Sequence, residues 1–299
     1  IEIAFNTRPI ETQDWSWDMN FNFSKNTNKV KSLASGLDRF TLSEAAWLNV
    51  TVDAVVGENY GAIMGKDFKR SPQGDVIVNA NTGLPEISDQ VSVLGNATWD
   101  WTGGMNTNIR YKDFSLGAIF DVKVGADLFS MSARSFYNTG KAKQTLAGRD
   151  EWYRSEEQRL EAGASETGWN STGGYIVKGV VENGVDGQGN TIYTTNSKYV
   201  DPEEYWKHIS TSVPSVFVYD NSYVKVREIT FSYRLPGKLV RKFADSMTVS
   251  FVSRNPFIIY KNIDNIDPDS NYNNSSGMGL EYGSLPSRRS LGFNVNIKF

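Results

Sequence analysis

Side chains able to do acid–base, nucleophilic or metal chemistry are scarce in this sequence. Its 299 residues include no Cys and one His, His208, which excludes thiol nucleophiles, cysteine zinc sites and most catalytic triads. Because no second His accompanies it, we expect His208 to pack within a loop or to face solvent. The adjacent acids at 156–157 and 203–204 are more typical of a solvated surface than of a glycosidase pair. We therefore predict that the protein is not an enzyme and holds no cofactor.

One segment has the opening spacing of a calcium-binding loop. Asp267, Asp269 and Asn271 match the first three ligand positions of such a loop. Tyr272, however, stands where the loop needs a glycine, and Met278 occupies the position of its final glutamate. We therefore predict no metal site.

Three tryptophans stand in polar stretches and are candidates for substrate binding: Trp152, Trp169 and Trp206. An indole ring can stack on the apolar face of a sugar, and it can equally pack within its own loop or against a partner protein. Both interpretations stay open, so these residues are named as candidates only.

The composition limits the class of protein. Lys and Arg number 31 against 34 Asp and Glu, and a net charge of -3 offers nucleic acid no basic surface. Only 39% of the residues are apolar, although there are 8 Trp, 14 Tyr and 16 Phe. No uninterrupted apolar run approaches the roughly 18 residues that a membrane helix needs. Membrane crossing is therefore expected only through strands.

Alternation of apolar and polar residues is the strongest structural signal. In 15–23 every odd position is apolar and every even position is polar. The same period of two runs through 114–128, where only Ile119 interrupts the polar side, and through 291–299. Such a pattern predicts strands with one apolar face.

Strand length separates the architectures that share this alternation. A β-sandwich or an open sheet under helices also has one apolar face per strand. Strands of soluble proteins usually have about 5 to 6 residues, whereas a bilayer crossing takes roughly 9 to 11. The longest runs are of the second kind, and their polar face of Asn, Ser, Gly, Asp and Lys suits a hydrated lumen. The sequence favours a transmembrane β-barrel.

We predict an all-β fold that forms part of a large antiparallel transmembrane β-barrel. The expected strands lie near 1–7, 14–31, 99–111, 113–129, 219–234, 246–261 and 288–299. The intervening polar segments 32–98, 130–218 and 262–287 are expected to be long extracellular loops, and the short connections to be periplasmic. Seven strands cannot close a wide transporter barrel, which takes about 22. We therefore expect the chain to be a carboxy-terminal piece whose remaining strands lie upstream.

The segment 220–233 changes phase. Val224 and Val226 are apolar at even positions, whereas Ile229 and Phe231 are apolar at odd ones. Either a β-bulge lies between them or the upper half of the strand has left the lipid. We favour the second explanation.

The segment 220–299 carries motifs of a known family. They are Asp-Asn-Ser-Tyr-Val-Lys-Val-Arg-Glu-Ile-Thr-Phe-Ser-Tyr-Arg-Leu-Pro at 220–236, Phe-Val-Ser-Arg-Asn-Pro-Phe at 251–257, Asp-Pro at 267–268 and a last strand ending on Phe299. This combination resembles the carboxy-terminal barrel of SusC/RagA-type TonB-dependent outer-membrane transporters of Bacteroidetes. Further matches run in order from about residue 14 onward, among them 57–65, 83–85 and 111–121.

The resemblance implies a function in the outer membrane of a Gram-negative, Bacteroidetes-like cell. It implies TonB-dependent uptake of a large nutrient, a glycan or a peptide, with a SusD-like surface lipoprotein as partner. The amino-terminal plug and the TonB-contacting segment of such transporters are expected to be absent from this sequence, 1–299. The last strand resembles the signal read by the outer-membrane assembly machinery, carried by Phe293, Val295, Ile297 and Phe299.

Two other functions remain open. One is a passive, porin-like outer-membrane barrel, which shares the strands but lacks the plug. The other is a soluble β-rich carbohydrate-binding or adhesive domain. A soluble domain would hide the apolar side of its strands, whereas a barrel would expose it to lipid.

Overall fold

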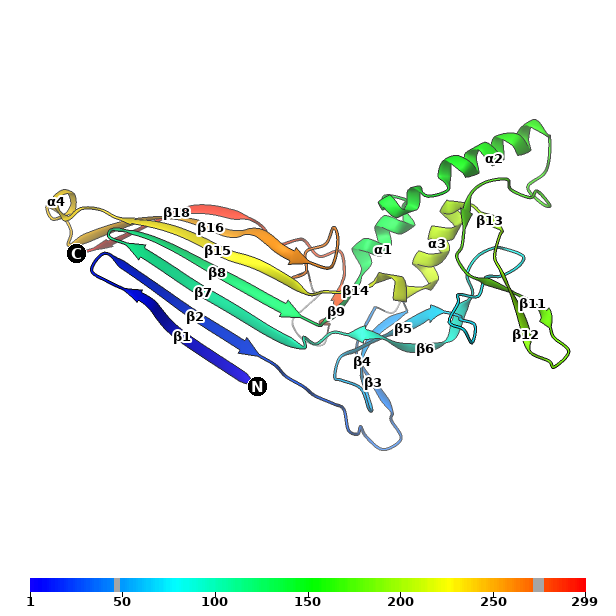
Figure 1. The fold of residues 1–299 in the computed structure, drawn as a ribbon, viewed down its shortest axis with the longest axis horizontal. Coiled ribbons are helices and arrows are strands. Elements are labelled where there is room, and N and C mark those ends of the chain that lie inside the picture. The colour runs from blue at the N-terminus through cyan, green and yellow to red at the C-terminus, as the bar shows by residue number, and fades with distance from the viewer. Residues whose placement is uncertain (46–48, 271–276) are drawn as a thin grey trace.

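The computed structural model describes residues 1–45, 49–270 and 277–299. This part of the chain contains one long antiparallel sheet, here called the main sheet, with a set of small sheets and helices at one end of it (Figure 1). The main sheet has the strand order β1-β2-β7-β8-β15-β16-β18. Its strands are β1 (Glu2–Glu11), β2 (Trp15–Ser24), β7 (Trp101–Tyr111), β8 (Phe114–Val124), β15 (Tyr223–Arg234), β16 (Ser246–Lys261) and β18 (Ser290–Lys298).

Connections at the two ends of the main sheet differ in kind. At one end, short segments join β1 to β2, β7 to β8 and β15 to β16, and the last of these carries α4 (Gly237–Val240). At the other end, the chain leaves the sheet after β2, β8 and β16 for long insertions that build the small sheets and helices (Figure 1). Within the main sheet, each strand pairs with the main-sheet strand that comes next in the sequence.

The strands differ from the expected ranges mainly at their ends. β1 continues past the predicted 1–7 to Glu11, with a register shift between Thr7 and Ile10. That shift accommodates Pro9, which cannot donate a backbone hydrogen bond to a ladder. β2 stops at Ser24, short of the predicted 14–31, because the regular alternation ends at Phe23. The predicted strand 113–129 is in fact two strands, since the chain turns at Gly125, where φ is +89°.

Cross-strand pairing separates the main sheet into an apolar and a polar face. Residues paired across neighbouring strands point to the same face. One paired row reads Ile10, Trp17, Ile109, Leu116, Phe231, Phe251 and Phe293. The adjacent row reads Ser16, Arg110, Ser115, Ser232, Ser250 and Asn294.

A β-bulge explains the change of phase in β15. Val226 and Glu228 of β15 pair with the consecutive residues Phe120 and Ile119 of β8, so Arg227 is an extra residue relative to that neighbour. Toward β16 the register also shifts here, but the extra residue lies in β16, between Phe257 and Arg254. A bulge moves every later side chain to the opposite parity. The explanation favoured from the sequence, in which the upper half merely leaves the lipid, was wrong in omitting this bulge.

The segments predicted to be long loops contain regular structure, and together we call them the loop block. Its four-stranded sheet consists of β3 (Arg39–Ala45), β4 (Val50–Val55), β5 (Ala62–Phe68) and β6 (Ile87–Asn96). Its helices are α1 (Met131–Asn138), α2 (Arg149–Glu161) and α3 (Pro202–Ser212). Its short strands are β9 (Asp127–Ser130), β10 (Tyr175–Ile176), β11 (Val180–Val185), β12 (Thr191–Thr195), β13 (Tyr199–Val200), β14 (Val218–Asp220) and β17 (Leu280–Glu281).

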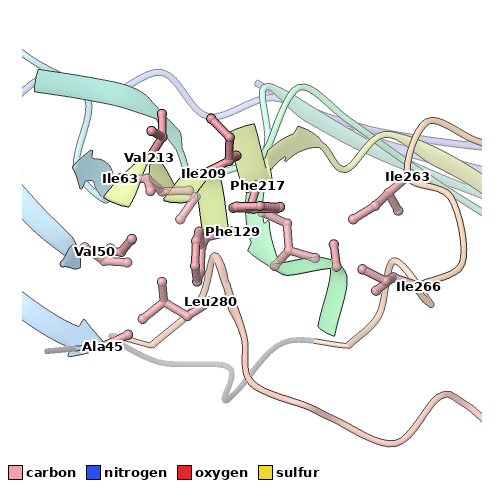
Figure 2. Packing of buried hydrophobic residues seen from close by; sticks show 14 of the residues in the cluster. Ala45, Val50, Ile63, Phe129, Ile209, Val213, Phe217, Ile263, Ile266 and Leu280 are labelled. Carbon is pink, nitrogen blue, oxygen red and sulfur yellow. The ribbon is translucent and has the colours of Figure 1, made fainter. Parts of the chain in front are cut away.

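The buried apolar core lies in the loop block. Phe129 of β9, Ile209 of α3 and Phe217 are fully or almost fully buried and pack in one cluster with Val50 and Ile63 of the four-stranded sheet (Figure 2). Ile263, Ile266 and Leu280, from the third insertion, complete this cluster. All three insertions thus fold together as one body.

Capping residues define where the helices α1 and α3 of this block begin. Ser130 caps α1 by accepting a hydrogen bond from Ala133 N, and Asp201 caps α3 by accepting one from Glu203 N. Pro202 occupies the first turn of α3, where its missing N–H costs nothing. None of the helices in the described residues is long and apolar enough to cross a membrane.

Candidate functional site

The apolar face of the main sheet is uncovered. Phe231 is 48% exposed and Val295 is 51% exposed, so no described element covers these side chains. The large apolar side chains exposed on it include Ile3, Phe5, Trp15, Tyr111, Phe114, Leu116, Phe251, Phe257, Leu291, Phe293 and Ile297. An exposed apolar surface of this extent needs an apolar environment.

Aromatic rings line this face at the end that carries the short connections. The ring centres of Trp15 and Tyr111 are 4.3 Å apart, and those of Phe114 and Tyr233 are 4.6 Å apart. All four belong to one cross-strand row, which continues into Val249 of β16. Rows of amphipathic aromatic residues mark the lipid–water interface of membrane barrels.

On the opposite face, polar residues lead to a group of charges where the main sheet meets the loop block. This group, here called the charged cluster, joins side chains of β8, β15 and the third insertion. Its members are Asp121, Tyr223, Lys225, Arg227, Asp267, Asp269 and Ser287.

Lys225 and Arg227 hold the charged cluster together. The Lys225 side chain is 3% exposed; its Nζ donates a 2.6 Å hydrogen bond to Asp269 and a second one to Asp267. Arg227 Nε donates to Asp121 at 2.9 Å, and the same guanidinium also pairs with Asp269. The hydroxyl of Tyr223 donates to Asp269 at 2.7 Å. Each buried charge thus has an opposite partner, as burial requires.

The acids of the third insertion are held ionised by this environment. Burial opposes the charge of Asp269, but hydrogen bonds from Arg227, Lys225 and Tyr223 outweigh it and keep the pKa of Asp269 well below its ordinary value. Asp267 behaves alike: hydrogen bonds from Lys225 and Ser287 overcome the effect of burial and lower its pKa. The cluster therefore fastens the third insertion to the wall of the main sheet.

These contacts also bear on the calcium-loop spacing seen in the sequence. Asp267 and Asp269 use their oxygens to accept hydrogen bonds from Lys225 and Arg227. Asp269 is paired with both cationic side chains and Asp267 with Lys225 alone, and carboxylates paired in this way are poorly placed to ligate a metal ion. Asn271 lies outside the described residues.

Two of the three candidate tryptophans border one cavity in the loop block. Trp152 of α2 and Trp206 of α3 line a cavity of about 380 Å³. The charged side chains around it are Arg149, Asp201, Glu203 and Lys207. An aromatic wall combined with a few polar groups is common in sites for small polar ligands.

Packing also occupies these tryptophans. Trp206 lies 4.8 Å from the ring centres of both Tyr137 and Tyr205. Trp169 is separate and donates from Nε1 to Ser155 Oγ at 3.4 Å. The structure thus brings Trp152 and Trp206 together and leaves Trp169 against α2.

The remaining polar candidates take structural positions. The Nε2 atom of His208, on α3, lies 2.9 Å from the carbonyl oxygen of Pro85, so this side chain packs between two segments of the loop block. Glu156 pairs with Arg159 along α2, and Glu203 pairs with Lys207 along α3. Pairs of this kind within one helix are surface features.

The four residues predicted to be an assembly signal lie at the end of the main sheet. Phe293, Val295 and Ile297 alternate on the apolar face of β18, and Phe299 follows this strand and is exposed. Within the described residues β18 pairs with β16. The role of the four residues in assembly stays a prediction.

One buried acid was missed by the sequence analysis. Glu281 of β17 is 1% exposed and accepts hydrogen bonds from Ser130 Oγ at 2.7 Å and Ser132 N at 2.9 Å. Its carboxylate therefore sits at the amino-terminal end of α1, where the helix dipole favours a negative charge. Nothing near Glu281 in the sequence signals this contact, because its partners are about 150 residues away.

Two curated proteins are similar in sequence to the whole chain. The whole chain is 26% identical over 324 residues to TonB-dependent receptor P3 of Formosa agariphila, and 22% identical over 323 residues to TonB-dependent receptor P26 of the same organism. The chain spans 28% of the length of each. No family model matches the chain.

Solved structures agree in fold. The whole chain superposes on 29% of a chain in the structure of the RagAB peptide transporter, with a TM-score of 0.58 and 14% identity. A RagAB peptide importer in an open–open state gives a TM-score of 0.57 at 13% identity, covering 28% of that chain. The main sheet is thus part of a large antiparallel transmembrane β-barrel, and the chain resembles TonB-dependent receptors in sequence and a RagAB transporter chain in fold.

Proposed function

We propose that this chain forms part of the wall and the extracellular surface of an outer-membrane importer of large nutrients that is energised through TonB. The observation that carries the proposal is the main sheet, whose apolar face is uncovered while its opposite face is polar and charged. Such a sheet suits lipid on one side and a hydrated bore on the other. The names of the curated relatives, TonB-dependent receptors, support the energised mode.

The proposal includes partners that lie outside this chain. TonB would act through an amino-terminal part of the intact transporter, and a SusD-like surface lipoprotein would contact the loop block. The loop block is suited to such a contact because it is a folded body with its own core rather than a set of flexible loops. We propose no catalytic step for it.

For the substrate, we propose a glycan or a peptide. Structural neighbours that import peptides support the second. The cavity bordered by Trp152 and Trp206 supports the first, because indole rings stack well on sugar rings. Either substrate would meet the loop block before it enters the bore.

Uptake by cells that express the intact transporter tests the proposal. Radiolabelled oligosaccharides and oligopeptides are offered with and without a protonophore, and with and without TonB. An energised importer loses uptake when the protonophore is added and also when TonB is absent. A passive porin-like barrel continues to equilibrate the label, and that result contradicts the proposal.

A further inference from the structure

The connection between β15 and β16 is unlike the others at its end of the main sheet. The segment 235–245 contains α4 and continues it by about one turn, since Arg241 N donates to Gly237 O at 3.0 Å and Ala244 N donates to Val240 O at 3.1 Å. The connections from β1 to β2 and from β7 to β8 contain no helix. A tight turn would suffice to reverse the chain, so the extra length calls for an explanation.

This segment, here called the α4 segment, is amphipathic. At about 100° per residue, Leu239, Val240, Phe243 and Ala244 fall on one half of the helix. Val240 and Ala244 are buried, whereas Leu239 is 64% exposed and Phe243 is 57% exposed. One apolar strip therefore packs on the protein, and the adjacent strip faces outward.

The other half of the α4 segment is basic. Lys238, Arg241 and Lys242 are all exposed, and none of them forms an ion pair with any other residue that the structure describes. Asp245, an exposed acid at the end of this segment, donates its backbone N–H to the carbonyl oxygen of Lys298 at 2.7 Å. The segment thus presents an excess of positive charge beside exposed apolar side chains.

The position of the α4 segment matches the edge of the bilayer. It lies beyond the strand ends, beside the end of β18 (Figure 1). The aromatic row that includes Trp15, Tyr111 and Tyr233 lies at the same end of the main sheet. Since such rows mark the headgroup level, the α4 segment would stand at or just outside that level.

We propose that the α4 segment binds the bilayer surface, with Leu239 and Phe243 inserted at the acyl boundary and Lys238, Arg241 and Lys242 on the phosphates of acidic phospholipids. Charge complementarity and the position beyond the aromatic row favour lipid as the occupant. This inference rests on the membrane placement proposed above. It makes the connection an interfacial anchor that fixes the depth and tilt of this side of the barrel.

The first test measures depth in the intact transporter reconstituted into nanodiscs that contain phosphatidylglycerol. Nitroxide labels are placed through Leu239→Cys, Phe243→Cys and Lys238→Cys, with Val295→Cys as a reference on the apolar face. Labels at 239 and 243 are expected to collide with oxygen and to be shielded from a water-soluble nickel reagent. The label at 238 is expected to show the reverse.

Each outcome of this test has a meaning. If the label at 295 also fails to contact lipid, the membrane placement itself is wrong. If 295 contacts lipid while 239 and 243 are open to nickel, the inference alone is overturned. Shielding of 239 and 243 from both reagents also overturns it, because that result indicates a protein partner.

The second test measures the lipid charge. Phosphatidylglycerol bound per transporter is counted by native mass spectrometry after competition with phosphatidylcholine. The triple variant Lys238→Gln, Arg241→Gln, Lys242→Gln is expected to lose preference for phosphatidylglycerol by roughly fivefold for each basic group removed. A matched control, Lys141→Gln, Lys143→Gln, Lys178→Gln, makes the same charge change at exposed positions of the loop block and should retain the preference. Equal retention by both triples overturns the headgroup contact.

Discussion

The main sheet and the loop block use apolar side chains in opposite ways. Phe217 in the loop block is 0% exposed and packs against other side chains, whereas Phe231 in the main sheet is 48% exposed on an uncovered face. The loop block is organised like a water-soluble domain with its own core. The main sheet has no such core and leaves its apolar face for lipid.

This difference indicates that the main sheet, unlike the loop block, needs lipid on one of its faces. A soluble body is stabilised by packing among its own residues, so a hole in it stays partly empty. A lipid-facing strand is stabilised by transfer from water to hydrocarbon, and fluid acyl chains can fill a hole on its surface. The same substitution should therefore have different costs in the two regions.

The largest expected effect comes from comparing Phe217→Ala with Phe231→Ala in the intact transporter in lipid. Phe217→Ala should cost about 3 to 5 kcal/mol, because it loses burial and leaves a cavity. Phe231→Ala should lose only the transfer term, about 1.5 to 3 kcal/mol. Hydrogen exchange of backbone amides in α3 and in β15 reports the two costs separately. A larger loss at Phe231 would contradict the assignment of the loop block as the packed core.

Charge placed on the two faces of β18 should have the next largest effect. If residue 295 lies near the middle of the bilayer, Val295→Arg should cost about 2 to 4 kcal/mol of membrane stability, whereas Asn296→Arg, on the polar face, should be nearly neutral. Urea unfolding of the intact transporter in lipid vesicles measures both variants. Equal costs would mean that the apolar face has been assigned wrongly.

The charged cluster predicts a smaller effect that depends on pH. Because the pKa values of Asp267 and Asp269 are lowered by their partners, their stabilising contribution is present above about pH 4, the ordinary value for Asp. It is lost as pH falls further and the two carboxylates take up protons. Amides of 262–270 should then exchange faster at pH 3 than at pH 6, after correction for intrinsic rates.

A variant provides the control for this pH effect. Asp269→Asn removes charged hydrogen bonds worth about 1.5 to 3 kcal/mol each and should open the same segment at pH 6. Amides of 249–254, within β16, should change little in either experiment. Unchanged exchange in 262–270 at pH 3 would show that the cluster does not fasten this insertion.

The smallest expected effect concerns the cavity bordered by Trp152 and Trp206. If a glycan stacks there, Trp152→Ala should weaken its binding by about 0.5 to 1.5 kcal/mol, the range for an aromatic contact. Trp169→Ala is the matched control, because Trp169 packs against Ser155 on α2. Isothermal titration of the intact transporter with oligosaccharides gives both affinities. Equal affinities for the two variants would leave the cavity without a role in glycan binding.

The sequence was most informative in the strands of the main sheet, where successive side chains face lipid and water in turn. In 15–23 and 114–124 each side chain faces either lipid or water, so the period of two is nearly unbroken and the strands can be predicted. The bulge at Arg227 was left as one of two alternatives because a change of phase also fits a strand that leaves the membrane. Only the pairing with β8 shows that Arg227 is an extra residue.

The loop block was largely missed because its elements are short and its core combines strands with helices. Asp201, Pro202 and Glu203 do form a helix-start signal for α3, and it could have been used. No such signal precedes α2, whose first residue follows Gly148, where no side chain caps the helix. Helix α2 could not have been predicted from its cap.

The sequence identified candidate tryptophans, but it did not show which side chains lie together in the folded chain. Trp152 and Trp206 were named from the sequence, yet only the fold brings them to one cavity. Arg227 contacts Asp121, 106 residues away, and Asp269, 42 residues away. No local pattern predicts pairings over such separations.

The contact between the main sheet and lipid can be measured directly along β18. Single cysteines at 291–297 in the intact transporter carry a fluorescent bimane, and emission is compared in vesicles of ordinary and brominated phosphatidylcholine. The account predicts strong quenching at odd positions and little at even ones, with a period of two along the strand. Quenching without this alternation, or confined to the even positions, would contradict it.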